Sequence, residues 1–159
     1  MDKPGVVVVA FEPRHAAAFV ALNVEWLERF FTVEAKDRAQ IEDAQTSIIG
    51  KGGAILIAED ETGAAIGCVA LVPYGEGELE LAKMAVSSAA QGRGVGRKLM
   101  DAAIAQARGM GARSIYLESN SSLTPAVTLY ERSGFLHLEP GERPASPYAR
   151  CDVYMRRPL

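Results

Sequence analysis

The stretch QGRGVGRKLM, residues 91–100, places three glycines where a helix is expected to begin. Glycine inside a helix costs about 1 kcal/mol relative to alanine, so a function is expected to offset that cost. The first N–H groups of a helix have no intrahelical partner and carry the positive end of the helix dipole. Because Gly92, Gly94 and Gly96 lack Cβ atoms, a diphosphate can approach these N–H groups closely. The stretch therefore predicts an anion-binding site.

The charges of this stretch support the same interpretation. Three basic residues lie within it: Arg93, Arg97 and Lys98. The whole chain is acidic, with 17 Lys and Arg against 20 Asp and Glu and a formal net charge of −3. A purely structural role is the alternative, in which Gly92 and Gly94 form a turn and Gly96 lets the helix pack closely on a sheet. Local charge opposite to the overall balance favours the anion site.

Two nucleotide-binding motifs fit this stretch poorly. The P-loop requires G-x-x-x-x-G-K-[ST], and the chain contains no such run. The dinucleotide fingerprint requires G-x-G-x-x-G at the first strand-to-helix turn of a doubly wound sheet. Here the spacing is G-x-G-x-G, past the middle of the chain. A nucleotide-binding protein is therefore the least favoured of the three function classes that the sequence leaves open.

Hydrophobic periodicity predicts the elements that position the stretch. Short apolar or alternating runs predict strands at residues 6–11, 54–60, 65–72, 78–86, 114–119, 135–139 and 151–155. Helical spacing predicts helices at residues 14–30, near 41–48, from the glycine-rich stretch to 109–111, and at 126–133. The first strand, rich in β-branched residues, is expected to be buried. This order indicates a mixed α/β sheet covered by helices, in a single domain over residues 1–159.

Composition favours some classes of protein and argues against others. Hydrophobic residues make up 48% and charged residues 23%, as in soluble globular proteins, and the acidic balance argues against nucleic acid as main partner. The apolar run VVVVA is too short for a membrane span or signal core, so no membrane association is expected. Cys68 and Cys151 have no metal-ligand spacing. We expect free thiols in a reducing cytoplasm, and no metal site.

Several motifs together resemble the GNAT superfamily of acyl-CoA-dependent N-acetyltransferases. Gln91, Gly94 and Gly96 match its pyrophosphate loop, Q/R-x-x-G-x-G/A. GGAILIAED, AAIGCVALV and ELAKMAV resemble its consecutive strands, CDVYM fits its last strand, and LTPAVTLYERSGF is similar to its A-x-x-L-Y-x-x-x-G-F segment. The resemblance covers nearly the whole chain. It implies a mixed, mostly antiparallel sheet of six to seven strands, with about four helices on both faces and strands splayed at an acyl-CoA cleft.

The resemblance implies acetyl-CoA as co-substrate, held by the glycine-rich loop and by backbone N–H groups of a splayed strand. The implied cofactor-binding residues are Met84, Ala85, Val86, Gln91, Gly92, Arg93, Gly94, Val95, Gly96, Arg97 and Asn120. The family often has asparagine seven positions before its tyrosine, where this chain has Leu123. Two alternatives stay open: Asn120 substitutes for that asparagine, or the contact to pantetheine is absent.

The resemblance also implies the catalytic residues. Tyr130 matches the family tyrosine that protonates the leaving thiolate, and a core tyrosine is the alternative. Glu118, twelve positions earlier, has the spacing of the base in ribosomal-protein N-terminal acetyltransferases. Glu80 is the competing base, at the position where other members carry a glutamate acting through water. Spacing puts Glu118 slightly ahead, although either glutamate fits a solvated carboxylate or an anchor for the substrate ammonium.

The acceptor is expected to be a small amine or an amino-acid-like molecule, attacking directly in a ternary complex. A protein N-terminus or lysine is the alternative acceptor. The acceptor side is expected to involve Trp26, Phe30 and Phe31, near the end of the first helix. Trp26 and Phe30 fit the core stripe of that helix, so a core position is the favoured alternative for them, whereas Phe31 lies off the stripe and is free to be exposed. The other candidates lie in the loop 140–150, where three side chains are able to bind an acceptor carboxylate: Arg143, Tyr148 and Arg150.

A function of another class stays open, namely a catalytically silent acyl-CoA-binding or regulatory module. Such a module needs residues 91–96 but neither Tyr130 nor a base. A homodimer also stays open as the assembly of the chain.

Overall fold

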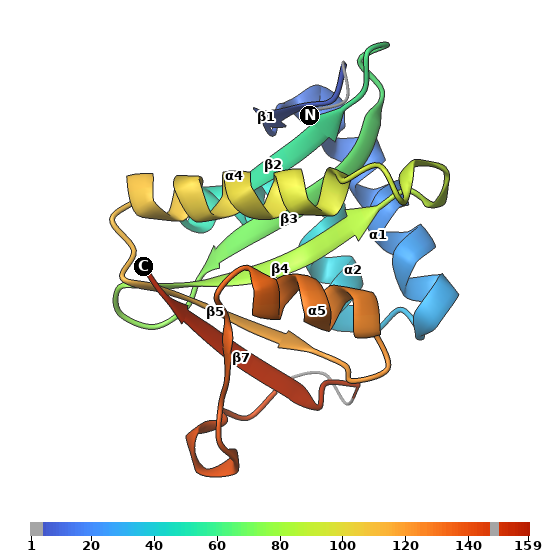
Figure 1. Cartoon of the computed structure of the whole chain (residues 1–159). Coiled ribbons are helices and arrows are strands. Elements are labelled where there is room, and N and C mark those ends of the chain that lie inside the picture. The colour runs from blue at the N-terminus through green and yellow to red at the C-terminus, as the bar shows by residue number, and fades with distance from the viewer. Residues whose placement is uncertain (1–4, 147–149) are drawn as a thin grey trace.

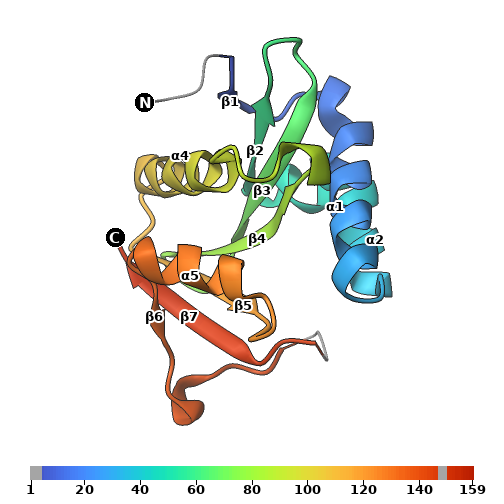
Figure 2. The same ribbon diagram turned by 45° about the vertical axis from the view of Figure 1, so that its right-hand side comes forward.

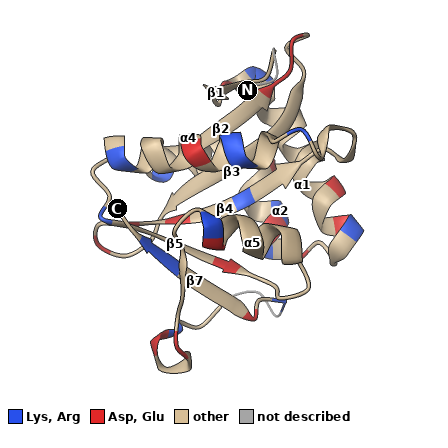
Figure 3. Ribbon diagram, viewed as in Figure 1, with Lys and Arg blue, Asp and Glu red and all other residues tan. Residues whose placement is uncertain are grey.

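The computed structural model describes residues 5–146 and 150–159. Tyr148, a candidate acceptor ligand, therefore lies outside the described residues. Figure 1 shows a single twisted sheet with helices packed on both of its faces. Figure 3 shows Lys and Arg interspersed with Asp and Glu along the ribbon.

Seven strands form the sheet, in the order β1-β2-β3-β4-β5-β7-β6. They are β1 (Val7–Ala10), β2 (Ala54–Glu59), β3 (Ala65–Pro73), β4 (Glu78–Val86), β5 (Ser114–Ser119), β6 (Leu136–His137) and β7 (Val153–Pro158). Only β4 and β5 pair in parallel, and all other neighbours are antiparallel. The predicted mostly antiparallel sheet of six to seven strands is confirmed.

Five α-helices and four short 3₁₀ turns complete the described chain. The helices are α1 (Ala16–Phe30), α2 (Ala35–Glu42), α3 (Ala44–Ser47), α4 (Val95–Gly109) and α5 (Thr124–Arg132). The turns are η1 (Pro13–His15), η2 (Ile49–Lys51), η3 (Ser88–Ala90) and η4 (Pro140–Glu142). Figure 2 shows α4 and α5 on one face of the sheet and α1 and α2 on the other.

Alternation along the strands divides the core between these faces. In β2, Leu56 and Ala58 pack in the cluster with α4 and α5, whereas Ile55 and Ile57 pack in the cluster with α1 to α3. Successive side chains of a strand point to opposite faces, which produces both clusters from one apolar run.

Two local expectations are wrong. The first strand is an edge strand rather than a buried one: β1 pairs only with β2, and Val7 is 53% exposed. The helix expected near residues 41–48 is interrupted at Asp43, where φ is −131° and ψ is 53°. Its apolar side chains nevertheless stay together in the core: Ile41, Ala44 and Ile48.

The splayed strands expected from the resemblance are β4 and β5. They pair only over three residues, with Glu78, Leu79 and Glu80 opposite Ser114, Ile115 and Tyr116. Beyond this short ladder the strands diverge, as Figure 1 shows, and residues 81–86 face residues 117–119 across a gap in pairing. A bulge adds to the distortion of β4, since its register with β3 shifts and Lys83 has a φ of 54°.

Candidate active site

Three cavities lie in a row through this splay. The loop cavity, about 400 Å³, lies between the end of β4, residues 91–96, and α5. The central cavity, about 100 Å³, lies between the splayed parts of β4 and β5. The outer cavity, about 370 Å³, is lined by α2, α3 and η2. The row therefore runs from the α4–α5 face of the sheet to its α2–α3 face.

Shared residues join the three cavities. Trp26, Met84, Leu123 and Tyr130 line both the loop cavity and the central cavity. A second group lines both the central and the outer cavity: Glu80, Ala82, Lys83 and Glu118. A molecule on one side of the sheet is thus able to meet a molecule on the other side at the splay.

The glycine-rich stretch forms one wall of the loop cavity. Gly94 is the N-cap of α4 with a φ of 76°, and Gly92 has a φ of 80°, a conformation that favours glycine. No atom lies within 4 Å of where a Cβ would stand at either residue. The α4 N-terminus has no side-chain cap and no acidic residue in its first turn. Its open N–H groups fit the diphosphate expected from the sequence.

Close packing of α4 on the sheet depends on a different glycine. A Cβ at Gly67 in β3 would lie 3.0 Å from the side chains of Val95 and Leu99. A Cβ at Gly96 would meet only Leu129, at 3.6 Å, an ordinary contact. Gly67, rather than Gly96, therefore allows the close packing of α4 on the sheet.

Most of the implied cofactor-binding residues line the loop cavity: Met84, Ala85, Val86, Gln91, Gly92, Gly94, Val95 and Gly96. Arg93 instead approaches Glu61, at 3.9 Å, and Arg97 lines a separate cavity between α4 and α5. Asn120 lines the central cavity and donates a hydrogen bond of 2.6 Å to the Arg150 carbonyl. Their roles in binding acetyl-CoA stay predictions.

Tyr130 lies where the loop cavity and the central cavity join. It is 8% exposed, and its ring packs edge-on to Phe135 at 6.2 Å. Burial raises the pKa of Tyr130 to about 12, with the Ser119 hydroxyl acting in the opposite direction. The phenol therefore stays protonated near neutral pH and is able to donate a proton into the junction.

The two candidate bases lie on neighbouring strands and face the same cavities. Burial, followed by the charge of Glu118, raises the pKa of Glu80 to about 7, and Lys83 opposes this shift. Glu118 instead accepts hydrogen bonds from Tyr116 at 2.8 Å and from Ser146 at 2.5 Å. Glu80 is thus poised to exchange a proton near neutral pH, whereas hydroxyl donors occupy both oxygens of Glu118.

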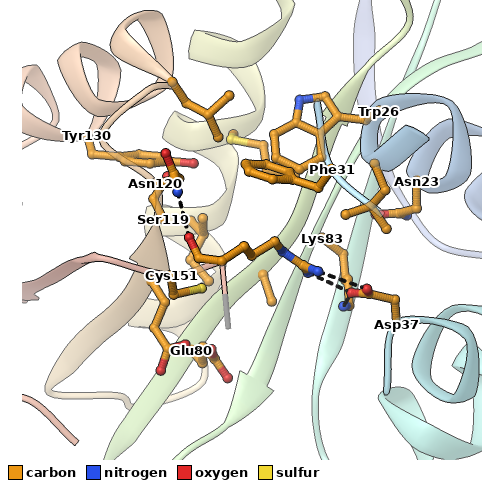
Figure 4. Close-up of a pocket in the computed structure, with 17 residues that line it drawn as sticks. Asn23, Trp26, Phe31, Asp37, Glu80, Lys83, Ser119, Asn120, Tyr130 and Cys151 are labelled. Atoms are coloured by element: carbon orange, nitrogen blue, oxygen red, sulfur yellow. Dashed lines mark hydrogen bonds and ion pairs between the residues drawn. The ribbon is translucent and has the colours of Figure 1, made fainter. Parts of the chain in front are cut away.

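A charged bridge crosses the central cavity. Asp37 is fully buried and lies 3.0 Å from the Lys83 ammonium and 2.8 Å from the Arg150 guanidinium. Burial acts to raise the pKa of Asp37, but the hydrogen bonds and charges around it lower it overall. Figure 4 shows Asp37 and Asn120 on opposite sides of the cavity, and Arg150 bonds to both. Arg150 therefore ties the loop before β7 to α2.

Comparisons with known proteins agree with this geometry. The family model described as "Acetyltransferase (GNAT) family" matches residues 16–135. The chain belongs to the GNAT family. Members of this family are acetyltransferases, and they generally use acetyl-CoA as donor.

Two curated relatives carry N-acetyltransferase names. The chain is 36% identical over 105 residues to an uncharacterised N-acetyltransferase of Schizosaccharomyces pombe, covering 65% of this chain and 63% of that protein. It is 39% identical over 80 residues to an uncharacterised N-acetyltransferase of Escherichia coli, covering 50% of this chain and 47% of that protein. The match thus spans about half to two thirds of the length of these relatives.

Solved GNAT structures share the fold. An acetyltransferase of the GNAT family from Staphylococcus aureus has a TM-score of 0.87 and 17% identity, covering 97% of this chain and 99% of its own. An acetyltransferase from Streptococcus agalactiae has a TM-score of 0.84 and 21% identity, covering 99% and 100%. At this identity the likeness concerns the fold alone.

At the end of α1, Phe30 does not occupy the core position that its place on the helix stripe favours. Phe30 is 46% exposed and lines the loop cavity, although it fits the core stripe. Phe31 is half-buried and lines the central cavity, 5.9 Å from the ring of Trp26. The last turn of α1 lies beside the splay, so the core stripe has no sheet to cover it there. Arg143 lies over the ring of Tyr154 at 5.3 Å rather than in the described cavities.

Sequence reasoning missed four buried residues of this GNAT site. Asn23 donates to the Cys68 sulfur at 3.5 Å, and that thiol donates to the Lys83 carbonyl at 3.3 Å. Burial raises the pKa of Cys68 to about 12, so it stays a thiol. Cys68 thus contacts the backbone of the β4 bulge at Lys83, and Asp37 contacts the Lys83 side chain. Helical periodicity offers one signal, since Asn23 and Asp37 are polar residues on buried helix faces.

Neither Cys68 nor Cys151 forms a disulfide. Within residues 5–146 and 150–159, no helix is long and apolar enough to span a membrane. No group of His, Cys, Asp and Glu in these same residues is arranged to hold a metal ion.

Proposed function

We propose that this chain transfers an acetyl group from acetyl-CoA to the primary amine of a small or amino-acid-like acceptor, by direct attack in a ternary complex. The observation that carries the proposal is the junction at Tyr130 and Met84, where the loop cavity meets the central cavity. The GNAT membership and the uncapped α4 N-terminus support the donor. The small central cavity, about 100 Å³, supports a compact acceptor.

The residues around the junction have complementary tasks. Bound acetyl-CoA supplies an activated thioester carbonyl. The backbone N–H groups near the bulge, in Met84, Ala85 and Val86, are the proposed donors to the carbonyl oxygen, as in an oxyanion hole. Glu80 is the proposed base that takes a proton from the amine, through water or directly. Tyr130 is the proposed acid.

The step balances in bonds and protons. The amine nitrogen forms a bond to the acetyl carbon while the bond from that carbon to sulfur breaks. Glu80 receives the amine proton and afterwards releases it to solvent, and the Tyr130 hydroxyl donates a proton to the departing sulfur. The Tyr130 phenolate is reprotonated by solvent, since its pKa of about 12 favours the neutral form.

Thiol release from acetyl-CoA across a panel of amines tests the proposal. The panel contains alkylamines, amino acids, and a peptide with a free N-terminus and an internal lysine, and product masses identify the acetylated atom. We expect thiol release and single acetylation with small primary amines. Binding of acetyl-CoA without release for any amine, or acetylation of the peptide alone, would contradict the proposal.

Gly96→Val tests the diphosphate site separately. The backbone at Gly96 is helical and has room for a side chain, so the variant is expected to fold, but the branched group protrudes into the loop cavity. Losing a hydrogen bond to a charged phosphate, worth about 1.5–3 kcal/mol, should weaken acetyl-CoA binding roughly 10- to 100-fold by calorimetry. Gly109→Val, at the other end of α4, is the matched control. Equal affinity of the two variants would remove this loop from the site.

A further inference from the structure

The outer cavity has two ends of opposite charge. Its inner end carries Glu80 and Glu118, which also line the central cavity. Its outer end carries Lys36 from α2 and Lys51 from η2, neither of which lines the central cavity. These lysines lie fifteen positions apart in the chain, and the packing of α2 against α3 brings both to the rim of one cavity.

The two rim lysines differ from the cations deeper in the row. Lys83 and Arg150 are both paired with the buried carboxylate of Asp37. Lys36 and Lys51 are exposed, and neither forms an ion pair with a carboxylate within residues 5–146 and 150–159. The neighbouring Arg38 is paired with Glu42 at 3.1 Å and does not line the cavity. The rim thus presents positive charge that the described chain leaves uncompensated.

We infer that the acceptor is a zwitterion, with a primary amine at one end and a carboxylate or other anion several bonds away. This inference rests on the proposed function, because it takes the reacting group to be an amine. The ammonium form of the amine lies against Glu80 and Glu118 before it loses its proton. The anionic group lies between Lys36 and Lys51. Since these lysines line only the outer cavity, the anion must be remote from the reacting nitrogen.

The distance between the amine and the carboxylate distinguishes this acceptor from other amines. We compare 6-aminohexanoate with hexylamine, which keeps the amine and the methylenes but lacks the carboxylate, and with glycine, whose carboxylate adjoins the amine. The kcat/KM for 6-aminohexanoate should exceed that for hexylamine roughly 3- to 30-fold, the scale of two partly exposed ion pairs. The difference should lie in KM, because the contact is remote from the reacting atoms, and should shrink as salt is added.

The double variant Lys36→Gln, Lys51→Gln identifies the rim as the cause. The ratio of kcat/KM between 6-aminohexanoate and hexylamine should fall toward one in this variant. Arg38→Gln, which removes an exposed α2 cation outside the cavity, should leave the ratio as in the wild type. A preference that survives the double variant, or a wild type without preference, overturns the inference.

A binding measurement separates this inference from failure of the proposed function. Trp26 is the single tryptophan of the chain and lines the central cavity, so its fluorescence reports occupancy without turnover. If no amine is acetylated, the proposed function fails, yet tighter binding of 6-aminohexanoate than of hexylamine, lost in the double variant, still supports the zwitterion site. Equal binding of both probes overturns the site whatever the activity.

Discussion

Tyr130→Phe is expected to lower turnover roughly 10²- to 10⁴-fold, the usual scale of a lost proton-transfer group. The variant removes one hydroxyl and keeps the ring in the core cluster with Phe135. The free energy of unfolding should therefore fall by only about 1 kcal/mol, the cost of a lost hydrogen bond. Acetyl-CoA affinity should change far less than turnover, because the proposed diphosphate site consists of backbone groups away from this hydroxyl. Steady-state kinetics, calorimetry and thermal unfolding measure the three quantities.

Tyr154→Phe is the matched control for this variant. The Tyr154 hydroxyl donates to the Cys151 carbonyl at 3.2 Å, and the residue lines none of the three described cavities. Its loss should affect stability alone. A folded Tyr130→Phe protein with wild-type turnover would remove Tyr130 from the mechanism and leave solvent as the proton source. Packing in the core would then be the whole role of Tyr130.

Glu80→Gln is expected to lower turnover at pH 8 by roughly 10²-fold or more and to abolish the acidic limb of the pH–rate profile. Because the pKa of Glu80 is about 7, the wild-type rate should rise as the pH increases through 7, where the carboxylate becomes able to accept a proton. Glu118→Gln should keep this limb. The raised pKa of Tyr130 predicts no opposing limb below about pH 11.

Stability provides a second readout for Glu80. The folded protein holds the Glu80 proton more tightly than the unfolded chain, since the pKa is raised from 4.5 to about 7. Stability is therefore lost as the pH rises from about 4.5 to about 7, where the unfolded chain is ionised and the folded protein still holds the proton, and the full loss is present above 7. The Gln variant cannot ionise there, so its stability relative to the wild type should be greater at pH 8 than at pH 5, by denaturant unfolding.

Other outcomes for the two glutamates are equally informative. Loss of the acidic limb only in Glu118→Gln would restore the order that the sequence spacing favours. Persistence of the limb in both variants would show that the substrate ammonium titrates instead. Either result contradicts the assignment of Glu80 as base.

The sequence by itself determined most of the elements and the position of the glycine-rich loop. Residues 78–86 and 114–119 were predicted as strands with the observed bounds, because alternation and apolar runs are local signals. The loop 91–96 is equally predictable from the sequence, because the helix start, the glycine spacing and the basic residues all lie within a few positions of one another. The motif order then indicated the family and its splayed sheet.

Only the tertiary structure decided which side chains meet at the splay. Asp37, Lys83 and Arg150 lie far apart in the chain, and no short pattern predicts their bridge. The preference for Glu80 over Glu118 depends on burial and on two hydroxyl donors, from Tyr116 and Ser146. Phe30 is exposed and Phe31 is half-buried because both lie at the end of α1, beside the cavities. Proton affinity and cavity shape depend on contacts between distant segments, which local periodicity does not encode.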